Sequence, residues 1–319
     1  MVTGAAGFIG SHFVRSLLAS RPPDTHVTAL DKLTHRAGWT RLDQVGDDHR
    51  LTRVTGDVCD AALLADLVPG HDAVVHLAAE SHVDTSIREP ARFVWSNVTG
   101  TQVLLDAARR GGVGRFLQVS TDEVYGSIES GTWPENAPLS PNSPYAASKA
   151  AADLLVLAAH RTYGTDVVIT RCANNYGSHQ LPEKLIPRFV TTLLTGGTVP
   201  LYGDGQHIRE WLHVSDHCAA LDLVLTRGRP GEVYHVGGGT AVTNEELTRL
   251  LLELCGAGWD RVRRIPDRLG HDRRYALDDT KIRTELGYRP KVPFDTGLPD
   301  TVRWYAEHPS WWTPLIDDD

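Results

Sequence analysis

The sequence predicts an α/β protein whose first half is a doubly wound parallel sheet, joined to a second, smaller α/β unit. Three observations support this fold class. Short apolar, β-branched runs alternate with amphipathic stretches, a glycine-rich turn stands at the start of the chain, and the pattern loosens after about residue 174. The chain has 319 residues, which is long for one average domain and sufficient for two.

The elements of the first half follow from the spacing of apolar residues. Short β-branched runs predict strands over residues 27–30, 51–55, 73–78, 116–120 and 167–171. Apolar residues that recur at three and four predict helices over residues 11–19, 97–110 and 145–163. The leading strand is left with only Met1 to Thr3, so either this strand is truncated or the assigned start lies too far downstream.

The second half is divided by prolines and glycines, and we expect the smaller unit to begin near residue 175. Thr243 and Glu246 have the spacing of a capping box, which predicts a helix from there to Leu254. Residues 214–238 have the pattern of a helix followed by a strand, which predicts a return to the first sheet. The glycines at 237–239 are expected to form a strand-to-helix turn, because no Gly-Lys-Ser/Thr follows them.

Composition excludes several classes of protein. The chain is 41% hydrophobic and 23% charged, as expected of a soluble globular protein, and its formal charge of -8 disfavours a nucleic-acid partner. No apolar run approaches the roughly 20 residues that cross a membrane, and no secretory leader is recognisable, so we expect a cytoplasmic protein without a membrane partner. The four cysteines lie far apart without a C-x-x-C pair and are expected to be buried thiols.

A dinucleotide site is indicated by the first turn. Residues 4–10 read GAAGFIG, which places Gly4, Gly7 and Gly10 between a strand and a helix, where backbone can approach a pyrophosphate. Asp31 ends the second strand and can accept both ribose hydroxyls, which favours NAD over NADP, although neighbouring Lys32 weakens that argument. Asp57 closes the third strand and is placed to meet the adenine, or else caps the helix that follows.

Two further motifs point to catalysis. Tyr145 and Lys149 lie one helical turn apart on the same face of a predicted helix. The strand over 116–120 ends in Thr121, Asp122 and Glu123, at the sheet edge where open α/β proteins bind ligands. Each motif alone has an ordinary structural explanation, such as a surface acid or a helix cap. Their joint occurrence in this order makes coincidence improbable.

These residues resemble the extended short-chain dehydrogenase/reductases, and further segments resemble the dTDP-glucose 4,6-dehydratases among them. The matching segments span nearly the whole chain and are residues 31–34, 77–84 (LAAESHVD), 120–126 (STDEVYG), 142–149, 171–177, 183–187, 209–211 and 270–275. Thr-Asp-Glu is the discriminating element, because related epimerases usually carry small hydroxyl residues there. The chain departs from the family pattern at His35 to Trp39, which can alter the loop that covers the cofactor, and at Thr85, where arginine is common.

The resemblance implies dehydration of dTDP-glucose to dTDP-4-keto-6-deoxyglucose, with NAD reduced and reoxidised within one cycle, by a hydro-lyase. Tyr145 would deprotonate the 4-hydroxyl, with its phenolate stabilised by Lys149 and by the nicotinamide charge. Glu123 would take the C5 proton, while protonated Asp122 would give its proton to the departing 6-hydroxyl. Thr121 would hold the 4-oxygen.

The resemblance also implies two domains and two sets of contacts. Residues 1–174, rejoined by about 214–238, would form an NAD-binding Rossmann domain, and residues 175–319 a nucleotide-sugar-binding domain. The cofactor contacts would be Gly4, Gly7, Phe8, Ile9, Gly10, Asp31, Lys32, Leu33, Thr34, Asp57, Val58, Leu77, Ala78, Ala79, Ser81, Ser96, Tyr145, Lys149 and Asn175. The substrate contacts would be Ser81, Thr121, Asn174, Lys184, Leu185, Pro200, Leu201, Tyr202, Arg209, Asn244, His271, Arg274 and Tyr275. Arg209 and Arg274 would neutralise the diphosphate, unless Arg209 instead pairs with Glu210 or Asp204.

Competing interpretations remain at this stage. A 4-epimerase or decarboxylase on the same fold would share the cofactor and the Tyr-Lys pair, and Asp122 and Glu123 argue against it. A non-catalytic dinucleotide sensor would typically lose the tyrosine or lysine. His213 and His217 lie four residues apart but lack a third ligand, so no metal is expected. The family commonly forms homodimers through two helices, here over residues 97–110 and 145–163, and a homodimer is expected.

Overall fold

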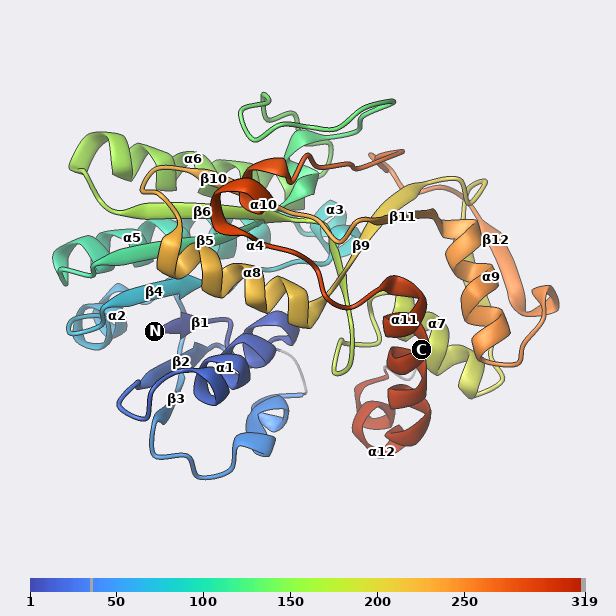
Figure 1. Ribbon diagram of the computed structural model, residues 1–319. Coiled ribbons are helices and arrows are strands. Elements are labelled where there is room, and N and C mark those ends of the chain that lie inside the picture. Colours follow the sequence, from blue (N-terminus) through green and yellow to red (C-terminus); the bar gives the residue numbers. More distant parts are fainter. Residues whose placement is uncertain (35–36, 317–319) are drawn as a thin grey trace.

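The computed structural model describes residues 1–34 and 37–316 of the chain. A seven-stranded sheet, parallel throughout, forms the larger half, with strand order β10-β6-β5-β4-β1-β2-β3 (Figure 1). Its strands are β1 (Val2–Thr3), β2 (Val27–Asp31), β3 (Leu51–Thr55), β4 (Ala73–His76), β5 (Arg115–Thr121), β6 (Val167–Cys172) and β10 (Val233–Val236). The predicted doubly wound sheet is therefore confirmed.

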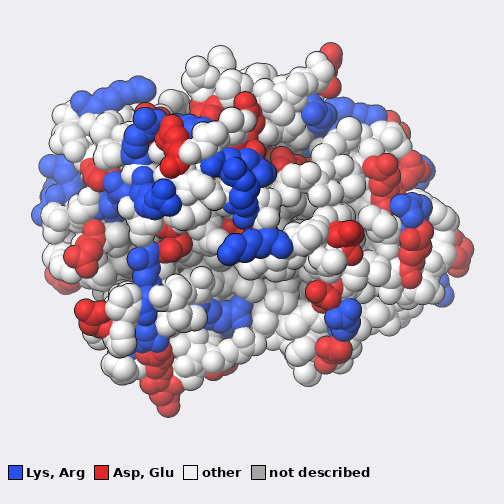
Figure 2. Space-filling model, in the orientation of Figure 1, with Lys and Arg blue, Asp and Glu red and all other residues white. Residues whose placement is uncertain are grey.

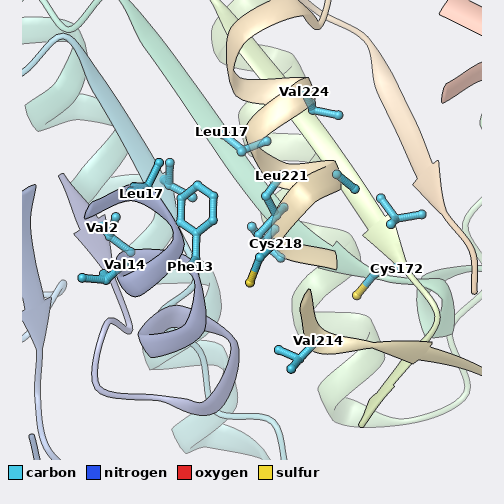
Figure 3. Packing of buried hydrophobic residues seen from close by; sticks show 14 of the residues in the cluster. Val2, Phe13, Val14, Leu17, Leu117, Cys172, Val214, Cys218, Leu221 and Val224 are labelled. Carbon is cyan, nitrogen blue, oxygen red and sulfur yellow. The ribbon is translucent and has the colours of Figure 1, made fainter. Parts of the chain in front are cut away.

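Helices cover both faces of this sheet. On one face, α1 (Phe8–Ser20) packs against α8 (Val214–Arg227), and α10 (Thr280–Leu286) contacts β10 (Figure 1). The other face carries α2 (Ala61–Leu67), α5 (Gly100–Arg110) and α6 (Pro144–Tyr163), preceded by the short helices α3 (Val83–Arg88) and α4 (Pro90–Phe93). Phe13, Leu117 and Leu221 lie in the core between α1, the sheet and α8 (Figure 3).

The smaller half contains two minor sheets. One joins β7 (Asn174–Tyr176), β9 (Ile208–His213) and β11 (Thr240–Thr243), and the other pairs β8 (Val199–Tyr202) with β12 (Val262–Ile265). The helices α7 (Leu185–Leu194), α9 (Asn244–Leu254), α11 (Phe294–Glu307) and α12 (Pro309–Trp312) belong to this half (Figure 1). The predicted capping box is confirmed, because Glu246 N donates to Thr243 Oγ1 at 3.0 Å while the Glu246 side chain accepts from Thr243 N.

Several predicted boundaries differ from the structure. The strand expected over 73–78 ends at His76, so Leu77 and Ala78 leave the sheet. The helix expected over 97–110 begins earlier as a π-helical stretch, Val94–Thr99, before α5. The glycines at 237–239 connect strand β10 to strand β11, so the expected strand-to-helix turn is wrong. The chain does return to the main sheet through α8 and β10, while the exact division into two domains stays a prediction.

No helix in the described part of the chain is long and apolar enough to span a membrane. Basic and acidic side chains are interspersed over the face of the molecule drawn in Figure 2. Of the divergent loop at residues 35–39, His35 and Arg36 lie outside the described residues, and Ala37 and Gly38 precede a turn of 3-10 helix at Thr40–Val45.

Three fully buried histidines make the stability of this fold sensitive to acid. Burial lowers the pKa of His76, His217 and His235 from 6.5 to about 3. Each of these histidines stays neutral in the folded protein, whereas in the unfolded chain it binds a proton below pH 6.5. Its contribution to the free energy of unfolding is therefore complete above pH 6.5 and is lost as the pH falls towards 3. Below about pH 6 we expect the free energy of unfolding in urea to fall by about 1.4 kcal/mol per pH unit for each histidine.

His217→Asn provides the control, because the asparagine amide can replace the ring nitrogen Nδ1 that lies 2.9 Å from Asn175 Oδ1. The variant should show a slope that is shallower by about 1.4 kcal/mol per pH unit. A slope equal to that of the unmodified protein would contradict the assignment.

Candidate active site

A cavity of about 360 Å³ opens at the carboxyl edge of the main sheet, beside β1 and β4, where the strand order reverses. Gly4 follows β1 with a φ of 65°, and a Cβ atom at this position would lie 2.6 Å from Ala78 N. At Gly10 an added Cβ would collide with the carbonyl of Gly4. Glycine is therefore required at both positions, because the turn brings two backbone segments into contact.

The N-terminus of α1 faces this cavity without a side-chain cap among the described residues. Its first N–H groups are therefore available to an anionic ligand such as a pyrophosphate. Arg41, which is buried, fixes the turn by donating from Nη1 to Ala6 O at 2.9 Å and from Nε to His179 O at 2.8 Å. Sequence reasoning missed Arg41, because a lone arginine after a divergent loop carries no motif.

Asp31 and Asp57 occupy the far end of the same cavity. Asp31 accepts from Ala6 N at 3.0 Å and from Leu33 N at 2.8 Å, which fixes its carboxylate at the end of β2. Lys32 Nζ lies 2.6 Å from Asp57 Oδ2, so its charge is paired. The alternative that Asp57 caps the next helix is wrong, because Asp60 caps α2 instead.

The five candidate catalytic residues all line this cavity. Thr121, Asp122 and Glu123 follow from β5 into a turn of 3-10 helix, and Tyr145 and Lys149 lie on the first turns of α6. Thr121 Oγ1 donates to Asp122 Oδ1 at 3.2 Å and accepts from Glu123 N at 3.3 Å. Lys149 Nζ donates to Val119 O at 2.7 Å, which ties α6 to β5.

The two neighbouring carboxyl groups have different electrostatic environments. Burial, reinforced by the charge of Glu123, raises the pKa of Asp122 well above its usual value, and Asp122 Oδ2 has no hydrogen-bond partner in the described part of the chain. Burial also raises the pKa of Glu123, but the charges of Arg209 and Lys184 oppose that rise. The site therefore favours a protonated Asp122 beside a more readily ionised Glu123.

The surroundings of Tyr145 in the protein alone favour its protonated form. Burial, followed by the charge of Glu123, raises its pKa well above 10. Burial also lowers the pKa of Lys149, against the charge of Asp153. Tyr145 and Lys149 alone therefore do not produce the phenolate expected from the sequence. A further positive charge near Tyr145 is needed to lower its pKa.

A second cavity of about 190 Å³ adjoins the first, and Ser81, Glu123, Asn174, Lys184 and Leu185 line both. Its wall comes mainly from the smaller half of the molecule. Among the predicted substrate contacts it contains Pro200, Leu201, Tyr202, Arg209, Asn244, His271 and Tyr275. A ligand that fills both cavities would pass directly over Glu123.

Arg209 is held in this second cavity by backbone and aromatic contacts. Its Nη2 donates to Asp272 O at 2.8 Å, and its guanidinium lies 4.2 Å from the centre of the Tyr275 ring. The alternative of an ion pair with Glu210 or Asp204 is wrong, because Glu210 Oε1 accepts from Gly238 N and Gly239 N, and Asp204 pairs with Arg273. The charge of Arg209 is therefore available to an anion.

Two predicted contacts lie elsewhere. Arg274 lines neither cavity and donates from Nη1 to Gly131 O at 2.9 Å, while Arg268, which sequence reasoning missed, lines the second cavity and pairs with Asp84. Leu33 is likewise absent from both walls, whereas the remaining predicted cofactor contacts line the first.

Two other side chains near the cavity support its backbone. The buried amide of Asn97, also missed, accepts from Glu80 N at 2.8 Å and donates to Ser148 Oγ at 2.8 Å, which fixes the backbone before Ser81. Thr85, which stands where arginine is common, bonds to His82.

Comparisons with known proteins agree with this geometry. A family model described as GDP-mannose 4,6 dehydratase matches residues 1–301. A dTDP-glucose 4,6-dehydratase of Streptomyces niveus is 58% identical, with 100% of this chain and 96% of the relative covered, and one of Streptomyces antibioticus is 60% identical, with 99% and 94% covered.

Solved structures of similar sequence also include a dTDP-glucose 4,6-dehydratase. DesIV, a dTDP-glucose 4,6-dehydratase of Streptomyces venezuelae solved with NAD bound, superposes with a TM-score of 0.97 at 60% identity, covering 99% of each chain. A UDP-glucose 4-epimerase of Thermotoga maritima superposes with a TM-score of 0.88 at 32% identity, covering 96% of this chain and 98% of that one. The fold is thus shared with epimerases. The higher sequence identity to the dTDP-glucose 4,6-dehydratases and the Thr-Asp-Glu sequence both agree with the dehydratase group. This chain belongs to the dTDP-glucose 4,6-dehydratase family.

Proposed function

We propose that this protein is a hydro-lyase that converts dTDP-glucose to dTDP-4-keto-6-deoxyglucose with NAD as its cofactor. The observation that carries the proposal is the pair of carboxyl groups in the larger cavity, with Asp122 buried and Glu123 half-buried where the two cavities meet. An epimerase on this fold needs the tyrosine and lysine, but it needs no acid and base to remove water.

The larger cavity fits NAD. The uncapped start of α1 can bind the pyrophosphate, and the carboxylate of Asp31 can accept the ribose hydroxyls. Because Lys32 is paired with Asp57, it is not free to neutralise a 2′-phosphate, which supports NAD over NADP. When bound, NAD would supply the oxidant for C4 of the hexose and the reductant for C6.

In the first step Tyr145 takes the proton of the 4-hydroxyl. The buried phenol needs positive charge to ionise, and Lys149, one helical turn away, together with the cofactor is the source we assign. Lowering a tyrosine pKa by about three units requires about 4 kcal/mol of differential stabilisation. Thr121, whose hydroxyl group lines the same wall, would hold the 4-oxygen.

Water is then removed by the acid–base pair. The 4-ketone acidifies the C5 proton, which Glu123 takes, while Asp122 gives its proton to the leaving 6-hydroxyl. Glu123 later returns its proton to C5 as C6 is reduced. The proton that Tyr145 took from the 4-hydroxyl replaces the one that Asp122 lost, so the cycle releases water and no net proton.

The nucleotide half of the substrate is assigned to the second cavity. Arg209 and Lys184 would neutralise the diphosphate, and Tyr202 offers an aromatic face to the pyrimidine. Arg268, whose guanidinium lies 5.1 Å from the centre of the Tyr202 ring, replaces Arg274 in this assignment.

We also propose a homodimer and a cytoplasmic location. Four large apolar side chains are exposed on neighbouring helical segments, namely Val94 (54%), Trp95 (57%), Leu154 (57%) and Tyr163 (63%). Because α6 packs beside both α5 and residues 94–99, these side chains offer a surface for a second copy. The four cysteines are free thiols, which supports a reducing compartment.

Conversion of dTDP-glucose is the first measurement. Incubated with dTDP-glucose or UDP-glucose and followed by mass spectrometry, the protein should remove one water from the thymidine substrate without net formation of NADH. Interconversion with a galactose isomer would instead identify an epimerase. Net NADH would identify a simple dehydrogenase.

Asp122→Asn should separate oxidation from elimination, because the amide cannot give a proton to the 6-hydroxyl. We expect the variant to oxidise C4 and accumulate bound NADH, seen as absorbance, while loss of water slows by at least about 100-fold. Tyr145→Phe is the contrasting control and should form no NADH. Elimination at the normal rate in the asparagine variant would remove Asp122 from the role of acid.

The dimer is tested by Trp95→Glu, which places a charge in the proposed interface. Sedimentation should show a dimer for the unmodified protein and a monomer for the variant. Trp259→Glu is the matched control, because this tryptophan is also exposed but lies beside β12, away from the proposed interface. A monomeric unmodified protein would refute the proposal.

A further inference from the structure

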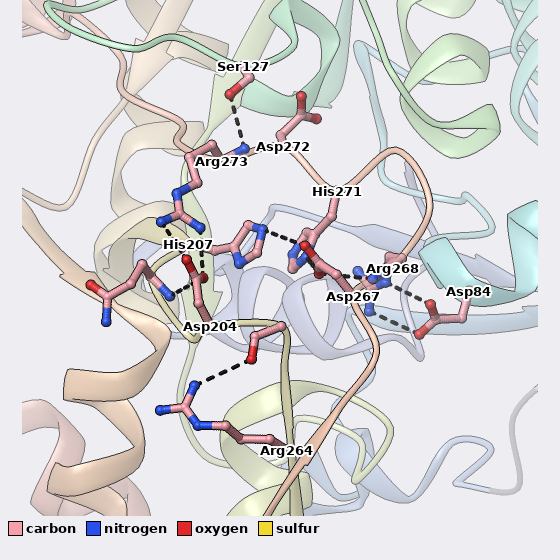
Figure 4. Close-up of polar contacts among 12 residues, drawn as sticks. Asp84, Ser127, Asp204, His207, Arg264, Asp267, Arg268, His271, Asp272 and Arg273 are labelled. Carbon is pink, nitrogen blue, oxygen red and sulfur yellow. Dashed lines mark hydrogen bonds and ion pairs between the residues drawn. The ribbon is translucent and has the colours of Figure 1, made fainter.

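Two histidines and an aspartate meet at the edge of the smaller cavity, away from the catalytic residues. His207 stands just before β9, and Asp267 and His271 belong to the segment that follows β12 (Figure 4). One ligand atom of each lies within 4.8 Å of the other two. The proposed reaction uses neither His207 nor Asp267.

The spacing of these atoms suits a small tetrahedral cation. His207 Nε2 lies 3.2 Å from Asp267 Oδ2, and His271 Nδ1 lies 2.7 Å from Asp267 Oδ1. Zinc binds imidazole nitrogen and carboxylate oxygen at about 2.0–2.2 Å, so adjacent ligands around it are about 3.3 Å apart. The two imidazole rings are stacked with their centres 3.8 Å apart and their planes 16° from parallel, and each contacts a different oxygen of Asp267. A ring has to turn out of this stack before both nitrogen lone pairs can point at one cation.

The charges around the cluster permit a cation. Arg268 pairs with Asp84 at 2.7 Å, and Arg273 pairs with Asp204 at 2.7 Å, so Asp267 is left to the two histidines (Figure 4). Arg264, in the same region (Figure 4), pairs with Glu245 at 2.7 Å. The carboxylate of Asp267 is therefore the charge that would attract a cation here.

Exposure gives the cation a route to the site. The Asp267 side chain is 43% exposed, whereas those of His207 and His271 are 3% and 9% exposed. A cation can therefore be captured by the carboxylate at the surface and held by two imidazoles from beneath. Structural and catalytic zinc sites use the same kinds of ligand.

We propose that His207, Asp267 and His271 bind a divalent transition-metal cation, with zinc as the preferred ion and water as the fourth ligand. The cation would join the start of β9 to residues 267–271, which include Arg268 and His271 of the second cavity. Without a cation His271 is hydrogen-bonded to Asp267 and His207 lies within ion-pair distance of the same carboxylate, and this is the alternative that an experiment must separate.

Cobalt titration of the full chain tests the site directly. After removal of metals with a chelator, added Co²⁺ should give the visible absorption band of a tetrahedral complex at one equivalent, and Zn²⁺ should displace it. Asp267→Asn and His207→Gln should each weaken cobalt binding by at least about tenfold. Circular dichroism of each variant establishes that it is folded.

His49→Gln is the matched control, because this histidine has a side chain that is 83% exposed and lies outside the cluster. It should bind cobalt as the unmodified protein does. The proposal is overturned if no band appears, if only millimolar cobalt produces it, or if Asp267→Asn retains it.

A second arm asks whether the site acts on the nucleotide cavity, and this part rests on the proposed function. A cation would add positive charge beside Arg209 and fix residues 267–271, so we expect Zn²⁺ to tighten dTDP binding by at least about fivefold. By linkage, dTDP should tighten zinc binding by the same factor. Both effects should vanish in Asp267→Asn, and unchanged or weaker dTDP binding overturns the coupling. A protein that binds cobalt but no dTDP would refute the proposed function and leave the metal site standing.

Discussion

The burial of two adjacent carboxyl groups is the constraint on which the rest of this site depends. Asp122 and Glu123 follow each other at the end of β5, where Asp122 is buried and Glu123 is half-buried in the wall of the cavity. Two such groups cannot both carry a charge at low cost, so one stays protonated unless a cation compensates. The different pKa values expected of the proposed acid and the proposed base are therefore created by their positions and not by residue type.

The smaller half of the molecule supplies that compensation. Arg209 lies on β9, and Lys184 directly precedes α7. Burial raises the pKa of Glu123, and the charges of these two residues oppose that rise. The same two cations face the second cavity, where an anionic substrate would bind. Under the proposed function, substrate binding and the pKa of the base Glu123 depend on the same two cations, so a diphosphate that neutralises them would also change the balance of protonation between Glu123 and Asp122.

The sequence was sufficient to bring together residues whose position depends on the local course of the chain. Gly4, Asp31, Thr121 to Glu123 and the Tyr145–Lys149 pair are fixed by strand ends or by one helical turn, and all of them line one cavity. Arg268 and Arg41 could not be found this way, because their roles depend on contacts across long distances in the chain, with Asp84 and Ala6 respectively. Arg274 was predicted as a substrate contact because it lies within a matching motif, but its side chain bonds to Gly131 O and lines neither cavity.

The environment of Tyr145 has a consequence for the order of events. In the protein alone burial and the charge of Glu123 raise the pKa of Tyr145 and favour the protonated phenol, so the proposed base of the first step would be inactive. Positive charge brought in by ligands would be required before the tyrosine could ionise. Meanwhile Asp122 remains protonated for the same reason of burial. Burial thus keeps the proposed acid protonated and the proposed base un-ionised, so the reaction would start only after the positively charged cofactor has bound beside Tyr145.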